Sequence, residues 1–412
     1  MSIRTSAQFA RLTRAHLNPY ILTMDIATLK ADFAKHFGSV DAGALRMIRA
    51  PGRVNLIGEH TDYNDGFVFP MAIEPQVIFV CRARADSKIV VRSSLFPGQA
   101  AEFSLDGKQG RGEPKWSNYV RGPVALLLER GIPLVGMDCL IVNTLPMGGG
   151  LSSSAAMEVG TTRAMLTLAG QTLDATAIAQ LTQKAEHIYA DVPCGIMDQT
   201  VVTSGRRGYA MLLDCRDNSK QFVPLDANDV TVVVVNSMVK HELSGGEYAQ
   251  RRQQCETGVA HFQKSDASIK ALRDVTMPQV LSAQSALGDV VFRRCRHVVG
   301  ENQRCLDFAD DLKAARYEHA GTLMVQSHDS LRDDYEVSTP ELDFLVATSV
   351  GMKGVYGSRM TGGGFGGCTV SLVVPRFVEA FITGIRAAYE AKYRINPVAF
   401  ATTATDGAGE MA

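Results

Sequence analysis

The spacing of apolar residues along the chain predicts alternating strands and helices. Short apolar or alternating runs predict strands, whereas apolar residues that recur every three or four positions predict helices with one buried face. The predicted strands cover 76–83, 88–93, 138–143, 209–214, 230–236 and 369–374. The predicted helices cover 25–36, 152–168, 174–189, 249–263, 301–315, 318–332, 340–349 and 376–392. This mixture indicates an α+β chain in which helices pack on sheets.

The length of the chain suits more than one domain. Its 412 residues contain no internal repeat and no low-complexity linker, and the turn-rich zone 204–208 is the predicted boundary. We therefore expect an N-terminal domain over 24–205 and a C-terminal domain over 206–412. Residues 1–23 are basic and lack acidic residues, so they form either a short targeting segment or a disordered extension, and we favour the extension.

Composition and charge narrow the classes of partner. The net charge of -1 gives no electrostatic reason to expect nucleic acid or an anionic membrane. The eight cysteines are scattered without a C-x-x-C pair, which is typical of buried thiols in a reduced compartment. No apolar run approaches the roughly 20 residues of a membrane span. We expect a cytoplasmic protein without nucleic-acid or membrane partners.

The stretch GRVNLIGEHTDYNDG, residues 52–66, carries more hydrogen-bonding groups than a core strand needs. Its last three residues, Asn64 to Gly66, predict a tight reversal in which Gly66 takes a positive φ. That turn does not account for the four polar residues at 59–62. We expect these to grip a ligand.

Two glycine-rich stretches also predict function. LPMGGGLSSSAAMEVG, residues 145–160, leads from three glycines into a helix that begins with serines, and such a loop can cradle phosphate on its backbone N–H groups. It matches neither the G-x-x-x-x-G-K-[ST] pattern nor a dinucleotide fingerprint, and an ordinary connection with a serine cap stays open. RMTGGGFGGCTVSLVV, residues 359–374, lets the backbone approach a ligand closely, with a flexible hairpin as the alternative.

Two carboxylates lie in AEHIYADVPCGIMDQ, residues 185–199. Asp198 follows a predicted bend at Gly195, which would present its carboxylate to a ligand. Glu186 stands at the edge of the apolar face of its helix, where a partly buried carboxylate needs a partner such as a metal ion. A surface salt bridge is the alternative for Glu186.

Together these motifs resemble the galactokinase family of the GHMP small-molecule kinase superfamily. The resemblance is carried by GRVNLIGEHTDYNDG, PMGGGLSSSAA, PCGIMDQ and MTGGGFGGC, and it continues in KWSNYVRG, KHELSGGEYAQRRQQC, RHVVGENQR, SHDSLRDDYE and DGAGEM. It runs from about Met24 to the C-terminus. It implies a two-domain α+β fold, with a ribosomal-protein-S5-like N-terminal domain, a ferredoxin-like C-terminal domain and the site between them. The implied reaction moves the γ-phosphoryl of ATP to the C1 hydroxyl of α-D-galactose, giving α-D-galactose 1-phosphate and ADP in galactose catabolism.

The resemblance also implies roles for individual residues. Asp198 matches the proposed general base, and Arg53 the cation beside it. ATP and Mg²⁺ are the implied cofactors, with Ser154 and Glu186 as magnesium ligands. Trp116 matches a position near the adenine, although a core role for it stays open. The implied sugar-binding residues are Glu59, His60, Thr61, Asp62, Asp198, Tyr248 and Gly363, and the implied phosphate loop is Gly148, Gly149, Gly150, Leu151, Ser152, Ser153 and Ser154.

Two other functions remain open at this stage. The first is a kinase for another sugar, chiefly N-acetylgalactosamine, and an assay across sugars separates the two. The second is a non-catalytic galactose sensor, against which the intact run 152–156 with Glu186 and Asp198 argues. Departures from the family pattern at Ala190-Asp191, at 199–205 (QTVVTSG) and at Ser358 bear on packing and fine specificity, not on the predicted catalytic positions.

Overall fold

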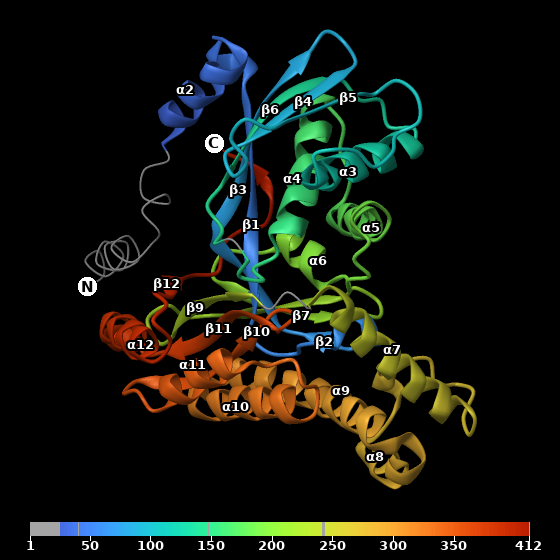
Figure 1. The fold of residues 1–412 in the computed structure, drawn as a ribbon, viewed down its shortest axis with the longest axis vertical. Coiled ribbons are helices and arrows are strands. Elements are labelled where there is room, and N and C mark those ends of the chain that lie inside the picture. The colour runs from blue at the N-terminus through green and yellow to red at the C-terminus, as the bar shows by residue number, and fades with distance from the viewer. Residues whose placement is uncertain (1–24, 40, 147, 241–243, 412) are drawn as a thin grey trace.

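The structure is a computed structural model that describes residues 25–39, 41–146, 148–240 and 244–411. The predicted extension over 1–23 lies outside the described residues. Figure 1 shows a sheet with helices on both faces in the N-terminal half, and a second group of strands and long helices below it.

The N-terminal half is built on a six-stranded sheet with the strand order β13-β1-β3-β6-β4-β5. Neighbouring strands are antiparallel except for the parallel pair β4 and β6. Helices α3 to α6 cover one face and α2 lies on the other (Figure 1). The strands are β1 (Arg46–Asn55), β3 (Pro70–Arg84), β4 (Lys88–Ser93), β5 (Ala100–Ser104), β6 (Gly136–Asn143) and β13 (Gly409–Glu410), and the helices are α2 (Ile26–Phe37), α3 (Asn118–Glu129), α4 (Ser153–Leu168), α5 (Ala175–Ala185) and α6 (Met197–Ser204).

The C-terminal half is built on a four-stranded antiparallel sheet with the order β10-β11-β9-β12. A smaller sheet, β2-β7-β8, lies beside it. The strands are β9 (Thr231–Lys240), β10 (Val355–Thr361), β11 (Gly366–Val373), β12 (Val398–Thr402), β2 (Phe67–Val68), β7 (Tyr209–Asp214) and β8 (Lys220–Pro224). The helices are α7 (Ser244–Gln263), α8 (Met277–Ser282), α9 (Gln284–Lys313), α10 (Tyr317–Asp333), α11 (Pro340–Val350) and α12 (Val378–Tyr393).

Local sequence signals explain several element ends. The side chain of Asp25 accepts a hydrogen bond from the backbone of Thr28 and caps α2, and Gly38 at φ 79° ends that helix. Asp174 caps α5 in the same way through the backbone N–H of Ala177, as its position before the apolar periodicity predicted. The predicted strand over 88–93 coincides with β4.

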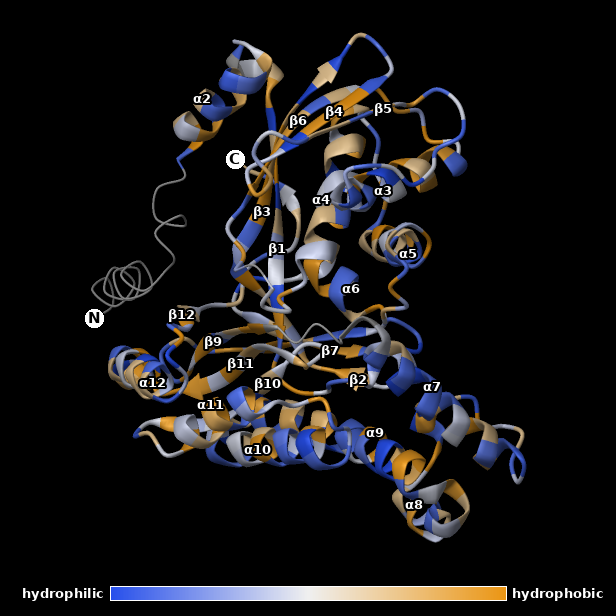
Figure 2. Cartoon of the chain, viewed as in Figure 1, coloured by the Kyte–Doolittle hydropathy of each residue, from blue (hydrophilic) through white to orange (hydrophobic). Residues whose placement is uncertain are grey.

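Two local predictions are wrong. Asp65, not Gly66, takes the left-handed conformation in the tight turn, with φ 56°. Gly66 serves a close approach instead, because a Cβ there would lie 2.3 Å from the side-chain oxygen of Asn302. Helix α9 begins at Gln284 and not near 301, and its regular path is broken at Gly288, where φ is 72°. Figure 2 shows apolar and polar residues mixed along this helix.

The division near residue 205 stays a prediction. The last strand, β13, belongs by hydrogen bonding to the N-terminal sheet, where Gly409 pairs with Arg49 of β1. The end of the chain therefore fastens the two halves together.

We predict that Gly321→Ala destabilises the fold. Gly321 lies where α10 packs on β10, and a Cβ there would stand 1.9 Å from the backbone oxygen of Tyr356. Overpacking of this kind costs about 1–3 kcal/mol. The free energy of unfolding from urea titration measures it. Gly300→Ala on α9 is the control, since only the flexible end of Arg304 comes as near as 3.1 Å. Equal stability of the two variants would contradict the prediction.

Candidate active site

A cavity of about 500 Å³ opens where the two halves meet. Its walls come from the loop after β1, the loop before α4, the start of α6, helix α7 and the loop between β10 and β11. It gathers most of the predicted site residues, although these are far apart in the sequence. Those that line it are Arg53, Glu59, His60, Asp62, Gly148, Gly149, Gly150, Leu151, Ser152, Ser153, Ser154, Glu186, Asp198, Tyr248 and Gly363.

Arg53 and Asp198 form a two-pronged ion pair at the centre of this cavity. The Nε and Nη2 of Arg53 donate to the two carboxylate oxygens of Asp198 over 2.7 and 2.9 Å. Such bidentate pairing fixes both groups in one plane. The ion pair with Asp198 outweighs the cost of burial and raises the pKa of Arg53. The Asp198 side chain keeps 22% of its surface exposed, so it can meet a ligand while Arg53 holds it.

The glycine-rich loop is tied to the same pair. The third guanidinium nitrogen of Arg53 donates to the backbone oxygen of Gly150 over 2.6 Å. Ser152, at φ 61°, does not cap α4 with its side chain, because its hydroxyl donates to Asp198 instead. A side chain at position 149 would stand 3.0 Å from the amide nitrogen of Asn236 and 3.1 Å from the sulfur of Cys368. The loop therefore lies flat against β9 and β11 and presents its backbone to the cavity.

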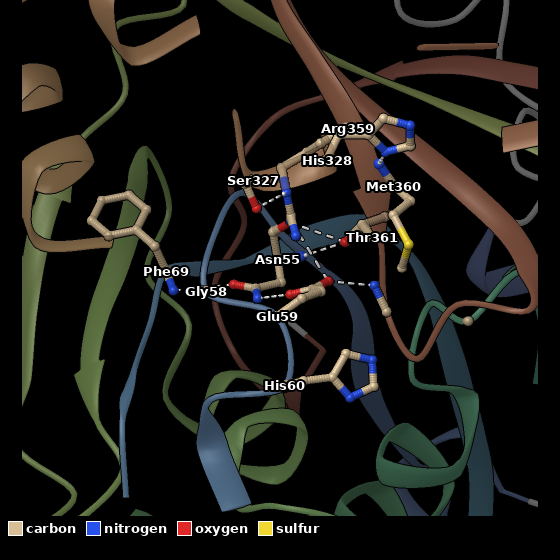
Figure 3. A network of polar contacts seen from close by, with 12 residues as sticks. Asn55, Gly58, Glu59, His60, Phe69, Ser327, His328, Arg359, Met360 and Thr361 are labelled. Atoms are coloured by element: carbon tan, nitrogen blue, oxygen red, sulfur yellow. Dashed lines mark hydrogen bonds and ion pairs between the residues drawn. The ribbon is translucent and has the colours of Figure 1, made fainter. Parts of the chain in front are cut away.

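Glu59 is held by a buried network rather than by solvent. Its carboxylate accepts hydrogen bonds from the side chain of Asn55 and from the backbone N–H of Gly362 (Figure 3). The guanidinium of Arg359 lies 3.7 Å away and is fully buried. Burial raises the pKa of Glu59, and the nearby arginines only partly oppose that rise.

His60 is fixed in one tautomer by its two partners. Its Nε2 lies 3.2 Å from the backbone oxygen of Gly363, which can only accept, so Nε2 carries the proton. Its Nδ1 then accepts from the hydroxyl of Tyr63 over 2.7 Å, and Tyr335 donates to Tyr63 over 2.8 Å. Burial lowers the pKa of His60 to about 3, which keeps the ring neutral. Tyr248 completes this aromatic wall, with its ring centre 5.6 Å from that of His60.

Asp62 lines the same cavity as Asp198. Burial, followed by the charge of Asp198, raises its pKa to about 7. A Cβ on Gly195 would stand 1.8 Å from its carboxylate, so only glycine at position 195 leaves room for Asp62.

Ser154 and Glu186 come together in the same cavity. The side chain of Ser154 hydrogen-bonds Glu186, which lies in a π-helical turn, Glu186–Ala190, and also accepts from Gln199 over 2.6 Å. Burial and then the charge of Asp198 raise the pKa of Glu186 to about 7. Glu158, one turn beyond Ser154, is also buried, and one of its carboxyl oxygens has no hydrogen-bond partner among the described residues.

This donor set fits a magnesium ion held together with a phosphorylated ligand. Mg²⁺ is bound by one or two protein oxygens plus substrate phosphates, and Ser154 and Glu186 offer such oxygens beside the glycine-rich loop. No cluster of three or more His, Cys, Asp or Glu suited to a metal occurs in the part of the chain that the structure describes.

Thr61 and Trp116 do not line the cavity. Thr61 is fully buried, and its hydroxyl lies 2.9 Å from the backbone oxygen of Gly58 and 2.6 Å from that of Phe67, so it shapes the loop. Trp116 stacks on Phe96, with ring centres 5.8 Å apart, and lines a second cavity of about 670 Å³. The two cavities adjoin, since residues 189–191 line one and Glu186 and Val192 line the other.

Sequence reasoning assigned no role to several polar residues that support the site. Arg359, Glu301 and His297 are all buried against the loop that carries Glu59. They lie in or beside the quoted segments RHVVGENQR and MTGGGFGGC. The sequence offered one signal for two of them: His297 and Glu301 belong to a cluster of polar residues within a regular helix, α9. Such a cluster does not by itself reveal that the residues are buried.

Comparisons with known proteins agree with this arrangement. Residues 31–83 match the family described as galactokinase galactose-binding signature, residues 118–206 the GHMP kinases N terminal domain and residues 308–390 the GHMP kinases C terminal. These matches and the fold define the class as a GHMP kinase.

Individual relatives are more specific. A galactokinase of Roseiflexus sp. (strain RS-1) is 42% identical over 388 residues, covering 94% of this chain and 98% of the relative. A galactokinase of Homo sapiens is 43% identical over 358 residues, covering 84% and 88%. The chain belongs to the galactokinase family.

Solved structures give the same result. The Lactococcus lactis galactokinase complexed with galactose has a TM-score of 0.89 at 33% identity, covering 94% of this chain and 100% of that one. The Methanococcus jannaschii mevalonate kinase, with a TM-score of 0.62 at 18% identity, shares the fold. The predictions of the family, of the two-domain α+β GHMP fold and of an ATP-using kinase are confirmed.

Two further observations concern the environment of the protein. All eight cysteines are free thiols. Among the described residues, no helix combines the length and apolar character that crossing a membrane requires.

We predict that Asp62 makes stability depend on pH near neutrality. The native carboxyl keeps its proton up to about pH 7, whereas the unfolded one loses it near its ordinary value of 3.8. Between these values the native state binds more protons, so the free energy of unfolding falls as pH rises, by at most about 1.4 kcal/mol per pH unit.

Asp62→Asn should remove this fall, so the stability difference between wild type and variant should change from pH 5 to 7 and level off above 8. Urea titration of the ligand-free proteins measures it. Asp86→Asn is the control, because Arg84 lowers the pKa of Asp86 to about 2 and its effect should be flat over this range. A flat difference for Asp62→Asn would contradict the raised pKa.

Proposed function

We propose that the chain transfers the γ-phosphoryl group of ATP to the C1 hydroxyl of α-D-galactose. One observation carries the proposal: an arginine-bound aspartate, Asp198, stands in one cavity between a sugar-type loop and a phosphate-type loop. Phosphoryl transfer needs positioning and neutralisation of charge more than covalent chemistry, and this arrangement supplies both.

The hexose would lie against the loop after β1. Asp62 and Asp198 offer carboxylate oxygens, and Glu59 offers the lone pairs not used by its buried partners. His60 lines the same wall with a neutral ring whose two nitrogens are bonded to Tyr63 and Gly363. Tyr248 would close the pocket. Side chains held in fixed orientations discriminate between sugar epimers. A hydroxyl in the wrong position leaves a buried polar group without a hydrogen-bond partner, which costs about 1–3 kcal/mol of binding free energy.

ATP would lie along the glycine-rich loop, with its phosphates on the backbone of residues 148–154 and at the start of α4. We place the adenine in the second cavity. Trp116 offers an aromatic face there, and Tyr119 and Asn118 line the same cavity. Residues 186–192 border both cavities, so one ATP molecule could place its adenine in one cavity and its phosphates in the other.

Ser154 and Glu186 would hold Mg²⁺. The chemistry supplied by the bound ion is neutralisation of charge on the β- and γ-phosphates. The side chain of Ser154 already interacts with the carboxyl of Glu186 in the protein alone, so the two groups stand together in the cavity. Gln199 fixes the second carboxyl oxygen of Glu186.

Asp198 would accept or orient the proton of the C1 hydroxyl. Its two oxygens are aimed by Arg53, which also neutralises part of the negative charge that develops at the attacking oxygen. Ser152 donates to the same carboxylate and connects it to the phosphate loop. The base and the phosphate cradle therefore share one hydrogen-bonded frame.

A kinase for N-acetylgalactosamine is the second candidate that the sequence motifs left open, and the comparisons do not favour it. We propose galactose because the signature over 31–83 and the relatives named galactokinase point to it. A cytoplasmic monomer or weak oligomer without nucleic-acid or membrane partners fits the free cysteines and the near-neutral charge.

We predict that Asp198→Asn lowers turnover by about 10²–10⁴-fold, because the substitution keeps the size of the side chain but removes its basicity. Affinity for ATP should fall far less than turnover, because the asparagine oxygen can still accept hydrogen bonds from Arg53 and Ser152 and so keeps the glycine-rich loop in place. Steady-state assays and calorimetric titrations of the folded variant measure both. Asp86→Asn, which breaks a comparable pair with Arg84 at 2.7 Å, should leave turnover unchanged.

The same assay, run across galactose, N-acetylgalactosamine, glucose and arabinose, tests the substrate. Galactose should give the highest kcat/KM. Faster turnover of N-acetylgalactosamine would select the second candidate, and no turnover with any sugar would favour a sensor.

A loss of turnover smaller than tenfold in Asp198→Asn would refute the proposed role of Asp198.

We predict that Glu186→Gln raises the magnesium concentration needed for half-maximal rate by at least about tenfold, since even outer partners of a metal site contribute 10–100-fold. Titration of the rate with MgCl₂ at fixed ATP measures it. Glu129→Gln, an exposed residue on α3, is the control. A normal magnesium requirement would make Glu186 a structural residue of its helix.

A further inference from the structure

We propose that Glu301 of α9 is a positioning residue for the sugar: it holds the backbone of the loop that presents Glu59, His60 and Asp62. The inference rests on the proposed function, because it assigns the outcome to galactose binding. Glu301 itself does not line the cavity.

The first observation is that Glu301 accepts hydrogen bonds from that backbone. Its Oε1 accepts from the N–H of Gly58 over 2.9 Å and of Glu59 over 3.3 Å. The hydroxyl of Ser327 donates to the same oxygen over 2.6 Å. Gly58 takes φ 94°, and residues 56–61 contain no helix or strand. The loop thus takes part of its shape from a carboxylate 243 positions further along the chain.

The second observation is a row of alternating buried charges. Arg359 lies with Nη1 3.7 Å from Glu59 and Nη2 3.9 Å from Glu301, and all three side chains are almost completely buried. Arg304 pairs with the other oxygen of Glu301 over 2.7 Å. Burial alone would raise the pKa of Glu301, but Arg304, His297 and Arg359 outweigh it and lower the pKa to about 2.

This row determines where the carboxylate of Glu59 points. Arg359 also donates to the backbone oxygen of Asn55 and to Ser327, so it cannot swing freely (Figure 3). With the charge of Glu301 removed, Glu59 becomes the sole carboxylate beside Arg359 among the residues that the structure describes. Arg359 would then attract the carboxylate of Glu59 more strongly and move its oxygens away from the sugar.

The third observation is that α9 touches the loop twice. His297, one helical turn before Glu301, donates from Nε2 to the backbone oxygen of Glu59 over 3.1 Å. One face of α9 therefore binds both the backbone N–H and the backbone C=O of Glu59. Because a shift of about 1 Å in a reacting group can cost about 10²-fold in rate, this grip bears directly on catalysis.

Glu301→Gln tests the proposal, because it keeps the shape and one acceptor oxygen but removes the charge. We expect the Kd and KM for galactose to rise by about 10–100-fold while the Kd for ADP stays within about twofold. Glu301→Ala should be worse than Glu301→Gln for galactose. Calorimetry with galactose and ADP, steady-state rates and thermal unfolding are measured on each protein.

Asp311→Asn is the matched control on the same helix. Asp311 is also a buried carboxylate, paired with Arg316 over 2.8 Å, but it does not touch the loop. It should lower thermal stability without changing either Kd. If Glu301 variants do not fold, Ser327→Ala, which removes one donor to Glu301, should still raise the Kd for galactose by a fewfold and leave ADP unchanged.

The results separate the two proposals. Wild type that does not phosphorylate galactose overturns the proposed function. Wild type that does so, with Glu301→Gln or Ser327→Ala behaving like Asp311→Asn, overturns the positioning role. Equal losses of galactose and ADP affinity also overturn it, because they would reveal a general structural effect.

Discussion

Arg53 joins the parts of the site to one another. Its backbone N–H donates to Leu151 over 3.2 Å, and its side chain donates to Gly150 and to both oxygens of Asp198. One residue of β1 thereby links the central sheet, the glycine-rich loop and the first turn of α6. A buried arginine whose three guanidinium nitrogens each donate a hydrogen bond is held firmly, and its loss would leave the partly buried Asp198 beside other carboxylates without this cation.

The second constraint is close approach between backbones. A Cβ on Gly362 would stand 2.9 Å from the backbone oxygen of Gly150, and one on Gly367 3.2 Å from that of Gly149. The two glycine-rich stretches therefore lie against each other, one from each half of the chain. Their glycines make this contact possible, so the loop between β10 and β11 helps to shape the glycine-rich loop before α4, the proposed phosphate loop.

Some of this was predictable from the sequence and some was not. Caps such as Asp174 and glycine-rich loops act through local chemistry, so a single chain reveals them. The burial of Arg359 and Glu301 depends on packing between segments that are distant in the sequence, which periodicity does not encode. The turn at Asp65 was misread because asparagine and aspartate also tolerate the left-handed region. Trp116 was placed near the adenine by resemblance, but only the structure reveals that it lines a separate, adjoining cavity.

The site accumulates more negative charge than its arginines balance. Asp198 contributes to the raised pKa of both Asp62 and Glu186, which lie on different sides of it. Any group that neutralises Asp198 or Glu186 therefore eases the ionisation of the others. A hexose hydroxyl that donates to one of these carboxylates and a cation near another would both reduce the net negative charge of the same cluster. In this arrangement the proposed sugar and nucleotide sites are coupled electrostatically through Asp198, and this coupling needs no conformational change between them.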